Sequence, residues 1–106
     1  MADTGERLQK IQTMLEKSPG DTFLLYALAI EYKNSGNKAL ALESLDKVIQ
    51  HDWGYCYAYY QKGQILEQEG DIETARKVYR EGIDAAERKG DQHAREEISG
   101  ALSMIE

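Results

Sequence analysis

The sequence predicts an all-α protein built from helix–turn–helix repeats, and two observations carry this prediction. First, a pattern of 34 residues occurs twice, because residues 22–55 align with residues 56–89 so that Gly36 coincides with Gly70. Second, each copy contains two stretches with apolar residues at helical spacing, separated by a Gly-Asn or Gly-Asp pair. A unit of this size cannot bury its own apolar face, so the repeats are expected to stack on one another.

Six helices follow from the apolar spacing and from the residues that start or stop each segment. Pro19 ends the first helix, and the glycines of the pairs at 36–37, 70–71 and 90–91 suit the left-handed position after a helix, while the following Asn or Asp suits the next N-cap. The expected ranges are 5–17, 22–35, 38–51, 55–69, 72–89 and 92–105. The expected inward residues include Leu8, Ile11, Met14 and Leu15 in the first helix and Leu40, Ala41, Leu45, Val48 and Ile49 in the third.

Two glycines lie inside predicted helices, where each costs about 1 kcal/mol relative to alanine. Gly63 and Gly82 fall on consecutive helices, so we expect them to face each other and to let the two backbones approach closely.

Composition limits the function. The net charge of −6 argues against a nucleic-acid partner, because binding to phosphate backbones depends on clustered Lys and Arg. The single cysteine, Cys56, cannot form an internal disulfide. The first residues, from Met1 on, show neither a basic nor an apolar leader region, and no apolar run reaches membrane-spanning length. We therefore expect a cytoplasmic protein without a membrane segment.

The repeated pattern resembles the tetratricopeptide repeat, a unit of two antiparallel helices with large and small residues at fixed positions. The matching residues are Leu25, Leu28, Ala29, Tyr32, Ala41 and Leu45 in the first unit and Tyr59, Gly63, Ala75, Tyr79 and Gly82 in the second. Lys62 stands where the family usually has Leu. The resemblance implies a short right-handed superhelix forming a single domain over 1–106: a half-repeat helix at 5–17, repeats at 22–55 and 56–89, and a C-terminal capping helix within 91–106. Continuing the 34-residue register beyond Lys89 would put Glu96 and Glu97 at core positions, which is why this last helix is expected to be a specialised cap.

In this family the first helix of each repeat lines a concave groove that contacts ligand. Carried over by position, the groove residues are Phe23, Tyr26, Ile30 and Lys33 in the first repeat and Tyr57, Tyr60, Gln64 and Glu67 in the second. Their aromatic and mostly uncharged character suits recognition of a peptide or partner helix. Some members hold a terminal carboxylate with a Lys and an Asn of this groove, but here Tyr26 and Tyr60 stand in place of the Lys, and Ile30 and Gln64 in place of the Asn. The tyrosines could instead be packing residues, and Phe23 could be covered by the first helix.

The sequence is compatible with functions of three classes. The first is a non-enzymatic scaffold or adaptor that binds a protein or peptide partner of unknown identity in this groove. The second is a structural protein that buries the same apolar surface in a homo-oligomer. The third, an enzyme or cofactor binder, lacks a Gly-rich phosphate loop, paired catalytic carboxylates and ligand-spaced companions for His51 or His93, so no catalytic residue, cofactor or metal is predicted.

Overall fold

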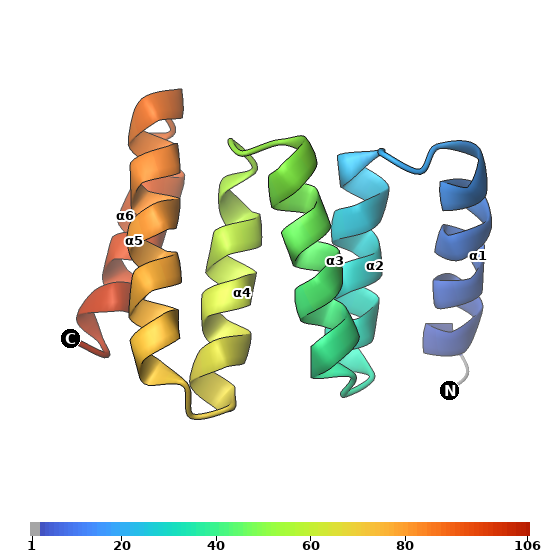
Figure 1. Cartoon of the computed structure of the whole chain (residues 1–106), viewed down its shortest axis with the longest axis horizontal. Helices are drawn as coiled ribbons and strands as arrows, with labels where there is room; N and C mark the ends of the chain where they lie inside the picture. The colour runs from blue at the N-terminus through green and yellow to red at the C-terminus, as the bar shows by residue number, and fades with distance from the viewer. Residues whose placement is uncertain (1–2) are drawn as a thin grey trace. The chain divides into compact units, whose positions relative to one another are not determined.

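The computed structural model describes residues 3–106 and contains only α-helices as regular secondary structure over that range. Met1 and Ala2, where the sequence was expected to lack a leader region, lie outside the described residues. The helices are α1 Asp3–Lys17, α2 Thr22–Asn34, α3 Lys38–His51, α4 Cys56–Gln68, α5 Ile72–Lys89 and α6 Gln92–Ser103 (Figure 1). The predicted all-α class and the six predicted helices are confirmed, with differences only at helix ends.

Helix packing divides the chain into two compact units, Met1–His51 and Asp52–Glu106. In the first, α2 packs against α1 on one side and α3 on the other; in the second, α5 packs against α4 and α6, and α4 also touches α6. Each predicted repeat thus has its helix pair within one unit. The assignment of 1–106 to a single domain stays a prediction.

The turns use the predicted combination of glycine and a capping side chain. Gly36, Gly70 and Gly90 have φ angles of 85°, 83° and 78°, the left-handed region that glycine enters without strain. The carboxylates of Asp21, Asp71 and Asp91 accept hydrogen bonds from the backbone amides of Leu24, Thr74 and Ala94, and the side chain of Asn37 accepts one from Leu40.

The first unit has its core between α2 and α3. The buried apolar residues are Leu25, Leu28 and Ala29 of α2, Ala41, Leu45 and Val48 of α3, and Ile11 of α1. Helix α1 is also linked to α2 by Arg7 Nε, 3.7 Å from Glu31 Oε2, and by Gln12 Nε2, which donates to the Tyr32 hydroxyl at 3.2 Å. Two residues expected to point inward do not, since Met14 is 47% exposed and Leu40 is 37% exposed.

The second unit buries large side chains on all three of its helices, and Ile65, Tyr79 and Ile98 are fully enclosed. Gly63 and Gly82 were expected to face each other, and this was wrong. A Cβ built on Gly63 would lie 2.2 Å from the ring of Tyr79, and one built on Gly82 would lie 2.7 Å from Tyr59 Cβ. Each glycine therefore makes room for a tyrosine of the other helix rather than for the other glycine.

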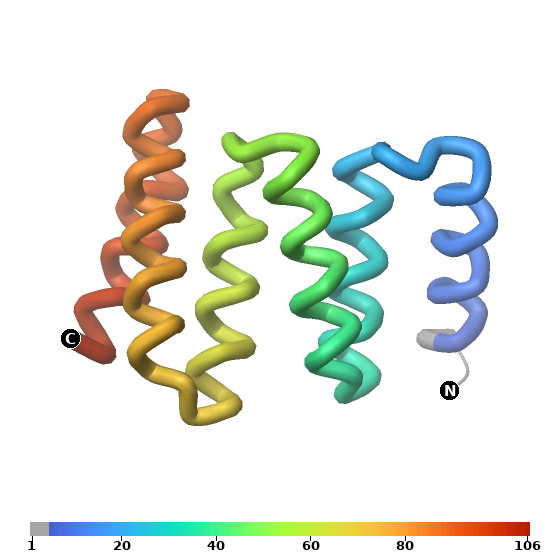
Figure 2. Tube along the Cα trace, in the orientation of Figure 1, coloured from blue at the N-terminus to red at the C-terminus, as the bar shows by residue number. Residues whose placement is uncertain are grey.

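The end of the second repeat differs in length from the end of the first. Helix α5 has 18 residues against 14 for α3, and only Gly90 and Asp91 join it to α6, the tight turn visible in Figure 2, whereas residues 52–55 join α3 to α4. Consequently α4 starts 34 residues after α2, but α6 starts 36 residues after α4.

This offset of two residues explains why the fixed register failed beyond Lys89. Glu96 and Glu97, which that register placed at core positions, are exposed. With the offset included, Ile98 and Leu102 of α6 align with Lys62 and Leu66 of α4, and both α6 residues are buried. Helix α6 thus repeats the pattern of a first helix, with the large apolar residue that α4 lacks at Lys62.

Candidate protein-interaction surface

The first four predicted groove residues lie together on α2. Phe23 leaves 69% of its surface exposed, and Tyr26, Ile30 and Lys33 are half-buried. The alternative in which α1 covers Phe23 is therefore wrong for the first unit. Because Leu25, Leu28 and Ala29 fill the core from the same helix, α2 carries apolar side chains on both its buried and its open side.

The second four lie together on α4. Tyr57, Tyr60, Gln64 and Glu67 are all half-buried and recur at intervals of three and four residues, which places them on one side of the helix. The rings of Tyr57 and Tyr60 meet edge to face, with centroids 6.3 Å apart and an interplanar angle of 82°. The two sets belong to different units.

Two tyrosine hydroxyls in the second unit, those of Tyr57 and Tyr79, donate hydrogen bonds to glutamates. Tyr57 Oη donates to Glu97 Oε1 of α6 at 2.6 Å, and this hydrogen bond to a carboxylate raises the pKa of Tyr57 to about 12. Tyr79 Oη donates to Glu67 Oε2, and burial together with that hydrogen bond raises the pKa of Tyr79. Both phenols stay protonated donors at neutral pH. Sequence reasoning missed Glu97, because the fixed register assigned it to the core.

The four tyrosines of α4 and α5 fall into two classes that the repeat register distinguishes. Tyr59 and Tyr79, at the family's large core positions, are 7% and 0% exposed, and Tyr59 Oη donates to the carbonyl oxygen of Trp53 at 2.7 Å. Tyr57 and Tyr60, at the predicted groove positions, keep part of their rings in solvent.

The turn before α4 is a packed structural feature. The guanidinium of Arg88 lies 4.2 Å from the centre of the Trp53 ring, a cation–π contact, and Lys89 Nζ donates to the carbonyl oxygen of Gly54 at 3.0 Å. Cys56 is buried, and burial raises the pKa of its thiol, so the group is not activated as a nucleophile.

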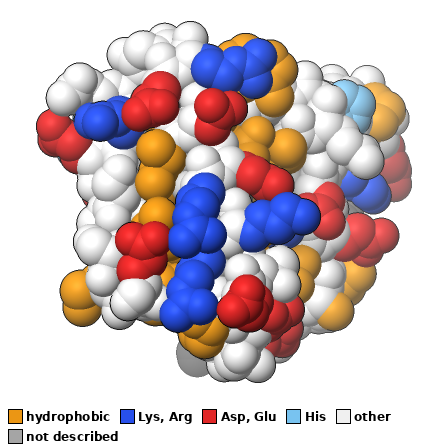
Figure 3. Space-filling model, turned by 60° about the vertical axis from the view of Figure 1, so that its left-hand side comes forward, with side chains coloured by type: hydrophobic (Ala, Val, Ile, Leu, Met, Phe, Trp, Pro, Cys, Tyr) orange, Lys and Arg blue, Asp and Glu red, His pale blue; other side chains and the backbone are white. Residues whose placement is uncertain are grey.

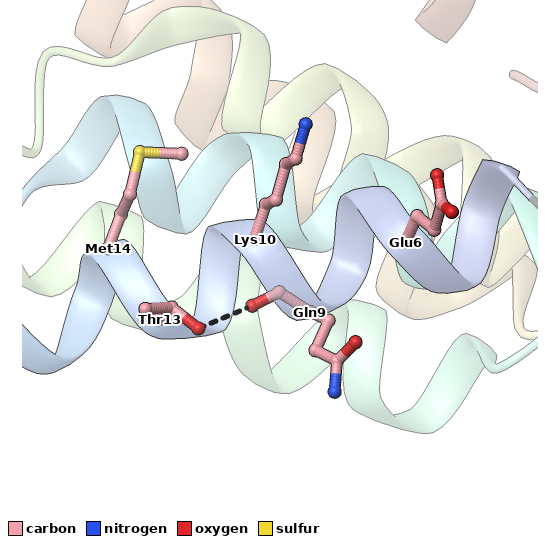
Figure 4. Close-up of a pocket in the computed structure, with 5 residues that line it drawn as sticks. All are labelled: Glu6, Gln9, Lys10, Thr13 and Met14. Atoms are coloured by element: carbon pink, nitrogen blue, oxygen red, sulfur yellow. Dashed lines mark hydrogen bonds between the residues drawn. The ribbon is translucent and has the colours of Figure 1, made fainter.

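A shallow hollow on α1 does not have the features of a site. Figure 4 shows that its lining residues all project from this one helix, and the only bond drawn among them is local, from Thr13 Oγ1 to the Gln9 carbonyl oxygen at 3.0 Å. The lining residues are Glu6, Gln9, Lys10, Thr13 and Met14. Polar groups converging from several elements, which mark a small-molecule site, are not found among these five.

The histidines and nearby acids have local roles. The His51 ring lies against Gly20, 3.3 Å from where a Cβ on that glycine would be, and Asp52 accepts a hydrogen bond from the Gly54 amide at 3.0 Å. Across residues 3–106, His, Cys, Asp and Glu side chains do not gather in threes as a metal ion would require. In the same range, none of the helices is both long and apolar enough to cross a bilayer.

Comparison with known proteins places this geometry in a family. A family model described as "Tetratricopeptide repeat" matches residues 57–89, the second of the two repeats. The solution NMR structure of a tetratricopeptide repeat domain protein from Salinibacter ruber shares 31% identity, covering 83% of this chain and 89% of that one, with a TM-score of 0.78. The chain belongs to the tetratricopeptide repeat family.

Two further relatives match almost the whole tetratricopeptide repeat chain. A TPR repeat-containing protein of Pseudomonas aeruginosa is 24% identical over 99 residues, which cover 93% of this chain and 94% of the relative. The solution structure of a Bordetella parapertussis protein is 26% identical, covers 99% of this chain and 88% of that one, and has a TM-score of 0.81. Tetratricopeptide repeats generally act as non-enzymatic modules in protein–protein interaction and scaffolding.

Proposed function

We propose that this chain is a cytoplasmic interaction module, a scaffold or adaptor without catalytic activity, that binds a peptide segment or partner helix. Its contact surfaces are the open side of α2 in the first unit and the open side of α4 in the second. The contact residues are those assigned from the sequence: Phe23, Tyr26, Ile30, Lys33, Tyr57, Tyr60, Gln64 and Glu67. The observation that carries the proposal is the 69% exposure of Phe23 on a helix whose opposite side is already buried.

Exposed aromatic residues on a folded helix are typical anchors of protein interfaces. Burying a phenylalanine side chain contributes about 1.5–3 kcal/mol, and that gain is unused in the free chain. Tyrosine adds contact area and a polar tip at low entropic cost, which is why aromatic residues dominate interface hot spots. The half-buried Tyr57–Tyr60 pair on α4 supplies such a surface next to its hydrogen bond with Glu97.

Affinity capture with matched variants tests the proposal. Wild-type protein, Phe23→Ala/Tyr60→Ala and Leu40→Ala serve as baits in lysate of the source cells, after circular dichroism shows equal helicity and melting. Leu40 is the control because it is apolar and partly exposed but lies on α3, outside the proposed surface. We expect a partner to be retained by wild type and Leu40→Ala and lost by the double variant. Equal capture by all three baits would contradict the assignment.

Self-association is the second candidate, because Phe23, Met14 and Leu40 are all exposed apolar residues of the first unit. Light scattering over a concentration series separates it from binding of a different protein. A molar mass that rises with concentration in wild type, and stays at one chain in Phe23→Ala, would favour the homo-oligomer.

A further inference from the structure

Helix α6 can be aligned with α4 by a shift of 36 residues, the 34-residue period plus the two-residue offset. In this alignment α6 presents the same open side as α4. Adding 36 to each α4 groove position gives His93, Glu96, Gly100 and Ser103, and all four are exposed. A Cβ on Gly100 would have no atom within 4 Å apart from the helix itself and its chain neighbours, so the helix surface is open there. The last helix is therefore more than a cap, because it extends the candidate surface of the second unit.

Side chains join the two helices at this surface. Glu97 Oε1 on α6 accepts a hydrogen bond from the Tyr57 hydroxyl on α4 at 2.6 Å. The same oxygen lies 3.3 Å from His93 Nε2, which is also on α6. The phenol is a neutral donor at neutral pH, so this hydrogen bond brings no positive charge to the face. We call Tyr57, Tyr60, Glu96, Glu97 and Gly100 the α4–α6 face.

The charge of the chain is concentrated in the unit that carries this face. Residues 52–106 contain twelve Asp and Glu against seven Lys and Arg, a net charge of −5, whereas residues 1–51 contain seven against six, a net charge of −1. Most of the −6 of the whole chain therefore belongs to the second unit.

The arginines of the second unit each lie beside a carboxylate outside the face. Arg76 pairs with Glu73, Arg80 with Glu106, Arg88 with Asp84 and Arg95 with Glu87. On the side of the molecule that Figure 3 brings forward, blue basic side chains accordingly lie next to red acidic ones. None of these four ion pairs involves Glu96 or Glu97. Glu96 Oε2 instead accepts a hydrogen bond from Gln92 Nε2 at 3.1 Å, and Glu97 Oε1 has Tyr57 and His93 as its neighbours.

We propose that the α4–α6 face binds an arginine-bearing segment of a partner protein; this rests on the proposed function and names the chemistry of its partner. A guanidinium forms two parallel hydrogen bonds with a carboxylate and also stacks on aromatic rings, so it matches glutamates placed beside tyrosines. The bare backbone at Gly100 gives the segment's own main chain room to approach.

The test uses the full chain and a defined probe: a short peptide with arginines separated by leucine and serine, and a copy in which every arginine is replaced by neutral citrulline. Binding is measured by calorimetry at low salt, and the position of binding by amide chemical shifts, with Gly100 as the reporter. The variants are Glu96→Gln/Glu97→Gln, Tyr57→Ala/Tyr60→Ala and, as a charge control in the first unit, Glu43→Gln.

We expect the arginine peptide to bind wild type and Glu43→Gln alike, to shift the Gly100 amide, and to bind Glu96→Gln/Glu97→Gln about tenfold more weakly, with the citrulline copy similarly weakened. Equal binding of the citrulline copy, an equal loss in Glu43→Gln, or no binding to wild type would overturn the proposal. If only the tyrosine variant lost binding of the peptide, the result would support the aromatic interaction surface and would contradict the assignment of an arginine-bearing partner.

Discussion

At the scale of single residues, the repeat register separates the tyrosines of α4 and α5 that build the core from those that face outward. Tyr59 and Tyr79 could be assigned to the core from the sequence, because they occupy the family's large positions, and the structure buries both. The hydrogen bond of Tyr57 to Glu97 could not be predicted, since it joins residues 40 apart and depends on where α6 begins. Periodicity fixes the side of a helix on which a residue lies, but not its partner on another helix.

That hydrogen bond predicts a pH-dependent contribution to stability. The pKa of Tyr57 is raised from 10.0 to about 12 mainly by its bond to Glu97, so the folded state holds this proton more tightly than the unfolded state. The resulting stabilisation is complete below pH 10 and is lost as the pH rises from 10 to about 12.

Replacing Glu97 with Gln should return the pKa of Tyr57 toward 10, since the charged acceptor is removed while the shape is kept. Tyrosine ring shifts followed by NMR across this pH range measure the change, and denaturant midpoints measure the stability. A Tyr57 titration that is the same in wild type and Glu97→Gln would show that the carboxylate is not its partner in solution.

At the scale of the helices, a glycine within a regular helix indicates close packing but does not identify the neighbour. The sequence could show that Gly63 and Gly82 need space, but only the structure shows that each space holds a tyrosine. The two-residue offset in the start of α6 could not be predicted for a similar reason. A period inferred from one pair of repeats cannot show that α5 continues for 18 residues and that its turn is short.

Substitutions of two helical glycines should therefore have opposite effects. Gly63→Ala places a Cβ 2.2 Å from the enclosed ring of Tyr79 and should destabilise the protein by about 1–3 kcal/mol, with Gly63→Leu costing more. Gly100→Ala meets no neighbour and should stabilise it by about 0.5–1 kcal/mol, because alanine favours helix. Chemical denaturation of the three variants gives the comparison, and a Gly63→Ala variant as stable as wild type would refute the packing of Tyr79 against Gly63.

At the scale of the whole molecule, the sequence predicts the six helices well, because their starts and stops depend on local residues such as Asp71 and Gly90. Total composition also gives the net charge. What composition alone hides is its uneven distribution, with −5 in residues 52–106 and −1 in residues 1–51, which becomes meaningful only when the units are known.

This uneven charge should govern the rate at which a cationic segment arrives. Raising the ionic strength from about 10 mM to about 150 mM shortens the Debye length from about 30 Å to about 8 Å. We expect the association rate of the arginine peptide to fall about tenfold and its dissociation rate to change much less, because long-range attraction acts mainly on encounter. Stopped-flow mixing measures both rates. The citrulline copy is the control, and a salt effect of equal size on that copy would contradict electrostatic steering.

The segment from Asp52 to Cys56 determines which part of the protein the common spectroscopic and chemical probes report on. The only tryptophan, held under Arg88, and the only cysteine, buried three residues later, both belong to the second unit. Tryptophan fluorescence and thiol alkylation would therefore both follow the opening of that unit alone. The first unit is silent to both methods, so a transition recorded by either one describes half of the chain and needs a backbone probe beside it.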